Sequence, residues 1–213
     1  MRKINKRGFS MVEIIVVVVI IGLIAGIAAG NMTDAKNKSE CELMAGEIRD
    51  FIAEGSAFAS KTSRSVPLTV TTNNTKTISC DPVSINGKNI IPWPNPVTGQ
   101  GYKLILQSRA DDLRLYYITK TQTRQTLFNN NKILNITLTA GAANDQLYLR
   151  PSGNPCIFNT STEYANRMPF ISVRKGKYMA LIEIRGSGNI SMYISKGAKA
   201  SDDIQARQFN GIK

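Results

Sequence analysis

The sequence predicts an α+β protein in which a long N-terminal helix leads into a β-rich head. Three observations point to this class: an apolar run lies close to the N-terminus, helix-spaced apolar residues follow it, and short β-type runs fill the remainder. The chain has 213 residues, enough for one domain of ordinary size and an appendage. With 42% hydrophobic and 20% charged residues, its composition is typical of a chain that folds.

Residues 1–8 form a short basic leader, and residues 9–30 form an apolar stretch that carries one charged side chain, Glu13. As a helix with a rise of ~1.5 Å per residue, this stretch matches the ~30 Å hydrocarbon core of a bilayer. The excess of basic residues before the stretch predicts a cytoplasmic N-terminus and a translocated body. The leader holds no acid and four basic residues, Arg2, Lys3, Lys6 and Arg7.

A cleaved secretory signal peptide is the competing interpretation, because Ala28, Ala29 and Gly30 fit the small-residue pattern of its cleavage site. Two features argue against it. The apolar run from Ile14 to Gly30 is longer than the ~7–15 residues typical of such signals. A carboxylate at the start of the run is costly near lipid, which indicates that Glu13 has a specific partner.

Residues 31–62 continue the helix and become amphipathic. No proline occurs between Gly30 and Pro67, and apolar or small residues recur at helical spacing. We therefore expect this half of the helix to pack on the domain that follows. The expected buried positions are Met44, Ile48, Phe51, Ile52, Gly55, Phe58 and Ala59.

Residues 63–213 are predicted to form the antiparallel β-rich head. Alternating apolar residues such as Leu113, Leu115 and Tyr117 are typical of half-buried strands. Proline-rich and asparagine-rich segments at residues 81–101 and 121–132 are predicted loops. The expected strands are Val66 to Thr71, Lys76 to Cys80, Tyr102 to Gln107, Leu113 to Thr119, Ile133 to Thr139, Gln146 to Arg150, Phe170 to Arg174, Tyr178 to Arg185 and Asn189 to Ser195.

The N-terminal residues carry a specific motif: Lys6-Arg7-Gly8-Phe9-Ser10-Met11-Val12-Glu13, followed by an apolar run. This pattern resembles the class III signal of type IV prepilins and type II secretion pseudopilins. The resemblance implies that a prepilin peptidase cleaves between Gly8 and Phe9, that the new Phe9 amine is N-methylated, and that the helix is retained. It also implies that Glu13 meets the Phe9 amine of a neighbouring subunit and sets its register during assembly.

The body is similar to GspH/FimT-type minor pseudopilins, through Ile48 to Ile52, Ser63 to Val70, Ile78 to Cys80, Leu149 to Gly153 and Ile184 to Ile190. This resemblance implies a structural or assembly subunit of a type IV pilus or a type II secretion pseudopilus. Such a subunit crosses the bacterial inner membrane once, with a periplasmic head. Its implied partners are prepilin peptidase, other pilin or pseudopilin subunits and inner-membrane lipid.

Catalytic, cofactor and metal sites are not expected. The chain has no histidine, which excludes serine-histidine catalysis and histidine-metal sites. Its three cysteines contain no C-x-x-C pair, so a zinc or thioredoxin-like site has no support. In an oxidising compartment, Cys80 and Cys156 are candidates for a disulfide that leaves Cys41 unpaired.

The formal net charge of +12 raises a second function, the binding of a polyanion such as DNA. One alternative is therefore a DNA-binding minor pilin of a natural transformation system. Another is a signal-anchored extracytoplasmic domain that is unrelated to filaments. The candidate DNA contacts are Lys120, Arg124, Lys196, Lys199, Arg207 and Lys213.

Overall fold

The computed structural model describes residues 9–72, 74–80, 83–85, 88–90, 93, 101–119, 128–129, 132–133, 139–140, 145–153, 155–159, 162–163, 167–185, 189–197 and 209–212. The chain divides into two compact units, Met1–Lys36 and Asn37–Lys213. The division falls after Lys36, whereas the predicted membrane segment ends at Gly30.

One helix, α1, runs from Met11 to Thr62, as the proline-free sequence predicts. It ends in a Schellman motif, a common helix-terminating arrangement of hydrogen bonds. Ser63 adopts a positive φ of 52°. The Ser63 N–H donates to the Ser60 carbonyl at 3.4 Å and the Arg64 N–H donates to the Ala59 carbonyl at 3.1 Å. These bonds satisfy carbonyl groups that the last turn would leave unpaired, and they direct the chain into the first strand.

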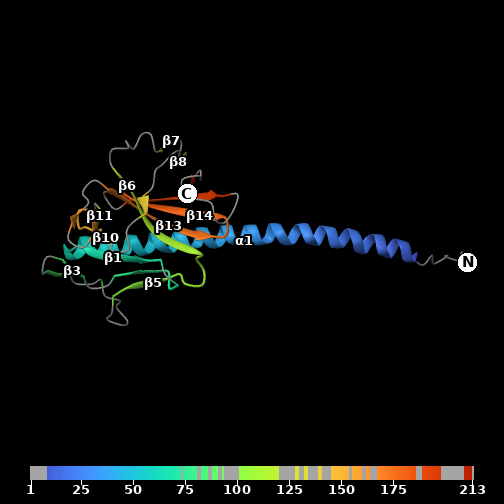
Figure 1. The fold of residues 1–213 in the computed structure, drawn as a ribbon, viewed down its shortest axis with the longest axis horizontal. Coiled ribbons are helices and arrows are strands. Elements are labelled where there is room, and N and C mark those ends of the chain that lie inside the picture. Colours follow the sequence, from blue (N-terminus) through green and yellow to red (C-terminus); the bar gives the residue numbers. More distant parts are fainter. Residues whose placement is uncertain are drawn as a thin grey trace, which may run out of the picture. The chain divides into compact units, whose positions relative to one another are not determined.

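The remaining described elements are strands, which confirms the α+β class (Figure 1). Their bounds are β1 Val66–Thr71, β2 Thr77–Ser79, β3 Val83–Ile85, β4 Lys88–Ile90, β5 Lys103–Ile105, β6 Asp112–Thr119, β7 Phe128–Asn129, β8 Lys132–Ile133, β9 Thr139–Ala140, β10 Asp145–Leu149, β11 Cys156–Asn159, β12 Thr162–Glu163, β13 Arg167–Lys175, β14 Tyr178–Ile184, β15 Ile190–Lys196 and β16 Phe209–Ile212.

Among the described residues these strands form three antiparallel sheets. A six-stranded sheet has the order β12-β11-β10-β1-β2-β5, and an eight-stranded sheet has the order β7-β8-β16-β15-β14-β13-β6-β9. Strands β3 and β4 form a two-stranded sheet within the described residues. Strands β15 and β14 lie at the centre of the larger sheet, and the neighbouring β13 pairs with β14 through Phe170↔Glu183 and with β6 through Phe170↔Tyr116.

The main core lies between the second part of α1 and the two large sheets, whose strands run beside the helix in Figure 1. Met44, Ile48 and Ile52 are fully buried, with Leu68 from the smaller sheet and Ile182 from the larger one in the same cluster. All seven helix positions that we expected to be buried are buried or partly buried. Burial of each large apolar side chain contributes roughly 1.5–3 kcal/mol, so this face holds helix and sheets together.

A second apolar cluster lies on the other face of the eight-stranded sheet. Successive side chains of a strand point to opposite faces, so Ala180 and Ile182 join the main core whereas Met179 and Leu181 join the second cluster. All seven residues of β14 are buried for this reason. The second cluster comprises Tyr116, Phe170, Met179, Leu181, Tyr193 and Phe209.

Three sequence expectations need correction. The predicted strand from Ile133 to Thr139 is not continuous in β structure, because β8 ends at Ile133 and β9 begins at Thr139, with residues 134–138 outside the described part. The predicted loop at residues 121–132 contains β7 and the start of β8. The predicted loop at residues 81–101 contains the β3–β4 pair and Trp93, which is 6% exposed. Strands of two or three residues carry too short a pattern to be read from sequence.

Candidate functional site

Ser10 and Glu13 cap the N-terminus of α1 in a variant of the capping box, in which the N3 side chain bonds the N-cap N–H and the N-cap hydroxyl bonds the N2 N–H. The Ser10 N–H donates to Glu13 Oε2 at 2.8 Å. The Val12 N–H donates to Ser10 Oγ at 3.3 Å, and the Ile14 N–H donates to the Ser10 carbonyl at 3.2 Å. Glu13 is therefore tied to the first turn of its own helix. The S-x-x-E spacing from Ser10 to Glu13 is a recognisable signal for this arrangement, and our sequence reasoning missed it.

Phe9 lies just outside the helix and is 84% exposed. Because α1 begins at Met11, the backbone at Phe9 and Ser10 is non-helical. A non-helical backbone can be drawn into a protease cleft without unwinding a helix. The predicted cleavage partner, Gly8, lies outside the described residues, so the cleavage position stays a prediction.

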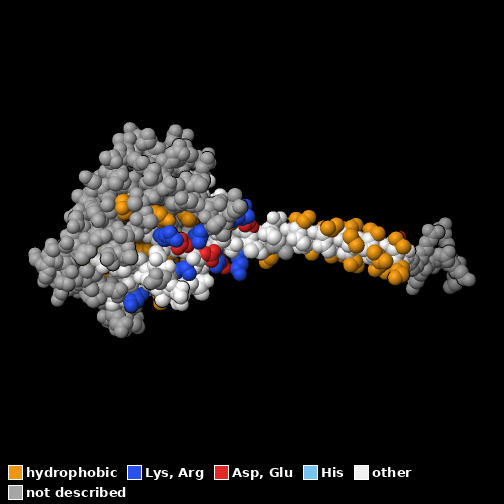
Figure 2. Space-filling view, viewed as in Figure 1, with side chains coloured by type: hydrophobic (Ala, Val, Ile, Leu, Met, Phe, Trp, Pro, Cys, Tyr) orange, Lys and Arg blue, Asp and Glu red, His pale blue; other side chains and the backbone are white. Residues whose placement is uncertain are grey.

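The first part of α1 is covered by exposed hydrophobic side chains (Figure 2). It is long and apolar enough to cross a membrane, and none of its apolar window is buried within the chain. Each such side chain gains roughly 1.5–3 kcal/mol on leaving water, so this surface requires lipid or other helices around it. The exposed residues are Met11, Val12, Ile14, Ile15, Val16, Val17, Val18, Val19, Ile20, Ile21, Leu23, Ile24 and Ile27.

The glycines of this segment make no close contact with other described residues of the chain. A Cβ atom added at Gly22, Gly26 or Gly30 would meet nothing within 4 Å. Gly55 differs, because a Cβ there would lie 2.9 Å from Leu149 Cδ1 and 3.2 Å from the Trp93 ring. Close packing within the head thus requires glycine at position 55 and at none of the three membrane positions.

Of the six predicted DNA contacts, the structure describes one. Lys196 is exposed, and its ammonium group lies 5.6 Å from the centroid of the Tyr178 ring. Lys120, Arg124, Lys199, Arg207 and Lys213 lie outside the described residues. The grouping of these basic side chains therefore stays a prediction.

The predicted disulfide between Cys80 and Cys156 is incompatible with the strand order. Cys80 directly follows β2, Cys156 begins β11, and both β1 and β10 lie between these strands. Neighbouring strands are ~4.8 Å apart, which separates the two cysteines by ~14 Å, whereas a disulfide needs Cα atoms within ~7 Å. Cys80 is instead buried, and its Sγ accepts a hydrogen bond from the Trp93 N–H at 3.0 Å.

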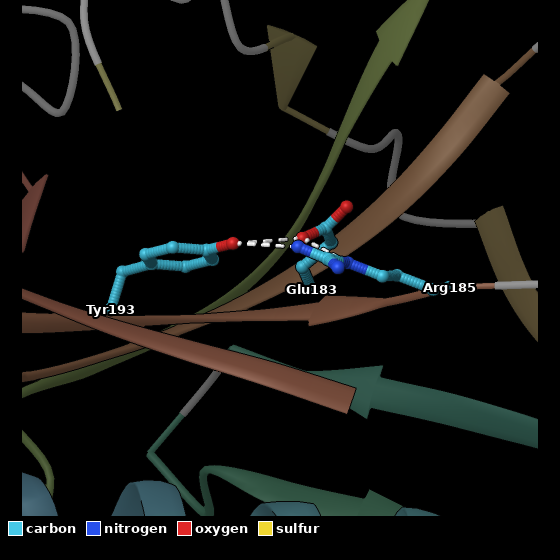
Figure 3. Close-up of polar contacts among 3 residues, drawn as sticks. All are labelled: Glu183, Arg185 and Tyr193. Carbon is cyan, nitrogen blue, oxygen red and sulfur yellow. Dashed lines mark hydrogen bonds and ion pairs between the residues drawn. The ribbon is translucent and has the colours of Figure 1, made fainter. Parts of the chain in front are cut away.

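A polar group that sequence reasoning missed lies at the end of the β14–β15 hairpin (Figure 3). Glu183 is fully buried, and its Oε2 accepts hydrogen bonds from Arg185 Nε at 2.9 Å and from the Tyr193 hydroxyl at 3.1 Å. Arg185 Nη2 also donates to the Tyr193 hydroxyl at 3.0 Å. Glu183 Oε1 has no hydrogen-bond partner within the described structure.

Electrostatics keep this group in its paired form. Burial and the neighbouring Glu183 carboxylate raise the pKa of Tyr193, so its hydroxyl stays protonated and can donate. Burial acts to lower the pKa of Arg185, but the hydrogen bond to Glu183, the Glu183 charge and Tyr193 together outweigh burial, so the pKa is raised. A buried carboxylate with donors on one oxygen is a structural anchor, since breaking such a pair leaves an uncompensated charge.

The N-terminal segment matches the model of a known protein family. Residues 3–29 match the model of the prokaryotic N-terminal methylation motif. Comparisons with curated proteins and with solved structures find no match. The matched residues include Gly8, Phe9 and Glu13, together with the exposed apolar part of α1. The chain therefore carries the N-terminal prepilin signature found in type IV pilins and pseudopilins, at the start of an apolar helix that is long enough to cross a membrane.

Proposed function

We propose that this protein is a minor pilin or pseudopilin, a structural subunit that takes part in the assembly of a type IV pilus or a type II secretion pseudopilus. The observation that carries the proposal is the methylation motif at the start of a helix whose first part exposes its apolar surface. Such a surface suits two environments in turn, the lipid of the inner membrane and the packed helices of a filament. The role is assembly rather than catalysis.

In this proposal, prepilin peptidase cleaves after Gly8, and the Phe9 amine becomes the methylated N-terminus. Glu13 is exposed in the single chain and uses Oε2 to cap its own helix. Its other oxygen is therefore available to the Phe9 amine of a neighbouring subunit. In an apolar helix bundle an opposite-charge pair offsets the desolvation that each charged group would suffer alone.

The processing step tests the proposal directly. Expression in a host with a prepilin peptidase should yield a mature chain that begins with N-methylated Phe9, as read by intact mass and N-terminal sequencing. The Gly8→Ala variant should be cleaved slowly or remain full length, because a side chain at this position obstructs close approach of the backbone to the protease. Cleavage after Ala28, Ala29 or Gly30 would instead identify a secretory signal. A processed chain that never enters sheared filaments would favour a membrane-anchored domain unrelated to filaments.

A DNA-binding minor pilin is the second candidate, and the net charge of +12 is the observation that favours it. Basic side chains on a translocated head attract phosphate through the release of counterions. Loss of duplex DNA binding on charge reversal in the C-terminal region separates this function from assembly alone.

A further inference from the structure

The head unit holds its part of α1 with ionic contacts as well as with the apolar core. Arg109, which follows β5, faces Glu47 of the helix. Arg109 Nη1 donates to Glu47 Oε2 and Arg109 Nη2 donates to Glu47 Oε1, both at 2.8 Å. Two parallel bonds between a guanidinium and a carboxylate fix both distance and orientation. The hydrogen bond to Glu47 raises the pKa of Arg109, so the arginine stays charged.

A second ionic contact lies about two helical turns closer to the N-terminus. Lys175, at the end of β13, places its Nζ 3.7 Å from Glu40 Oε2 of α1 and 3.6 Å from Asp111 Oδ1. Asp111 is itself held, because its Oδ2 accepts a hydrogen bond from the Gly176 N–H at 2.6 Å. Lys175 thus lies between a carboxylate on the helix and a carboxylate on the loop that precedes β6. The Lys175 side chain is only 20% exposed, so solvent screening of this contact is reduced.

The turn between β13 and β14 also packs on the helix itself. Gly176 has a positive φ of 55°, and a Cβ added there would lie 2.7 Å from Asn37 Nδ2. Asn37 is the first residue of the head unit. The turn that carries Lys175 and Gly176 therefore meets α1 at the residue where that unit begins.

We propose that Glu40, Glu47, Arg109, Asp111 and Lys175 form an ionic clamp that sets the place along α1 where the helix becomes part of the head. The apolar core begins only at Cys41 and becomes continuous from Met44 and Ala45 to Ile48. Residues 37–40 lie before that core, and the clamp and the Gly176 turn contact them from the head.

The clamp separates the head from the N-terminal part of α1, which would leave the lipid bilayer for a filament in the proposed function. Residues before Asn37 can change their surroundings while the clamp keeps the change from spreading into the head. When the clamp is broken, the first firmly held residue should shift from Asn37 toward Met44, where the core takes over. The inference concerns the single chain and does not depend on filament assembly, so it can fail or hold independently of the proposed function.

Amide hydrogen exchange on the full chain in detergent micelles tests the clamp, because exchange reports local opening along a helix. In Lys175→Met and in Arg109→Met, the amides of residues 37–43 should exchange about fivefold faster or more, as expected for the loss of a partly buried ion pair. The amides of residues 51–59, which lie on the core, should keep the wild-type rate. Fluorescence of Trp93, the one tryptophan of the chain, reports whether the head remains folded.

Two ion pairs confined to α1 are matched controls. Lys38–Glu42 has the same 3.7 Å separation as Lys175–Glu40, and Arg49–Asp50 has the same 2.8 Å separation as Arg109–Glu47. Lys38→Met and Arg49→Met should leave exchange at residues 37–43 within about twofold of the wild type, since these exposed pairs contribute little. An equal increase in these controls would show that general helix stability, not the clamp, sets the boundary, and would overturn the inference.

The exchanged pair Glu47→Arg with Arg109→Glu should recover most of the protection that Arg109→Met loses. If Trp93 fluorescence shows that Arg109→Met does not fold, exchange is measured in Arg109→Lys. This variant keeps the positive charge but cannot form the two parallel hydrogen bonds to Glu47. Wild-type exchange at residues 37–43 in a folded Lys175→Met or Arg109→Lys chain would overturn the clamp.

Discussion

Glu13 makes its described polar contact within its own chain, with the N–H of Ser10. A capping carboxylate also interacts favourably with the positive end of the helix dipole. The residue thus has one role that the single chain can satisfy and a second role, pairing with a neighbour's Phe9 amine, that stays a prediction. Because a capping box works with glutamine as well as with glutamate, the two roles can be separated by substitution.

Glu13→Gln should keep the helix cap and lose the charge. We expect its recovery in sheared filaments to fall about tenfold or more, in line with the ~1.5–3 kcal/mol of a charge-assisted hydrogen bond. Ser10→Ala is the matched control, since it costs about 1 kcal/mol of cap stability but leaves the carboxylate in place. Its recovery should stay close to that of the wild type.

Quantitative blotting of sheared filaments against membrane fractions measures both variants. Membrane insertion of Glu13→Val should be intact or improved, because an apolar span lacks the carboxylate penalty. If Glu13→Gln enters filaments as well as the wild type does, the charge has no role in assembly, and the glutamate serves only as a cap.

At the scale of elements, the two parts of the continuous helix α1 have different surroundings. Its first part exposes apolar side chains, whereas its second part buries one face against both sheets. Aromatic rings mark the far end of the buried face: the Trp93 ring stacks on Tyr102 at 4.5 Å between centroids and lies 5.1 Å from Phe51. Gly55 lets this group and Leu149 approach the helix backbone.

Two glycines of α1 should respond in opposite ways to alanine. Gly46→Ala adds a Cβ that meets nothing within 4 Å, so the helix should gain roughly 0.5–1 kcal/mol in the free energy of unfolding. Gly55→Ala forces a Cβ to within 2.9 Å of Leu149 Cδ1, so it should cost roughly 1–3 kcal/mol despite the same gain in helix propensity.

Denaturant titration of the full chain in detergent, followed by Trp93 fluorescence, measures both changes. The Gly46 variant is the control for helix propensity in the Gly55 variant. A Gly55→Ala chain as stable as Gly46→Ala would show that Leu149 and Trp93 can move aside, and would contradict the tight contact described here.

At the scale of the whole molecule, the question is what the excess positive charge does. A net charge of +12 favours association with any polyanion at low salt, so affinity alone is not informative. A built DNA site differs from diffuse attraction because it depends on where the charges lie. Two sets of charge reversals that change the net charge equally but lie in different regions therefore decide between a DNA-binding function and assembly alone.

The paired reversals Lys199→Glu with Arg207→Glu should reduce duplex DNA binding by at least tenfold near 0.15 M salt if the C-terminal region forms the site, where the Debye length is ~8 Å. Lys61→Glu with Arg64→Glu, two exposed residues at the end of α1, change the net charge equally and should have a much smaller effect. Fluorescence anisotropy across a salt series measures both. Equal losses in the two pairs, or no binding at 0.15 M salt, would leave assembly as the function.

The sequence by itself determined the features that depend on local chemistry. Short segments of sequence are enough to recognise the basic leader, the apolar run with its single carboxylate and the 3.6-residue period of α1. Insertion into lipid and helix geometry both depend on residues that are close together in the chain. Strands with clear alternation, such as β6 with Leu113, Leu115 and Tyr117, were predictable for the same reason. The prepilin motif needed no tertiary structure at all.

Only the tertiary structure decided which distant residues meet. Arg109 and Glu47 lie 62 positions apart in the chain, and nothing in their local sequence pairs them. Trp93 lies in a segment with the composition of a loop, yet it is buried in the core, while Cys80 and Cys156 are kept apart by the strand order. Glu183 is buried because β14 is central and covered on both faces. Strand pairing joins residues far apart in sequence, so these placements depend on the whole fold and not on any local pattern.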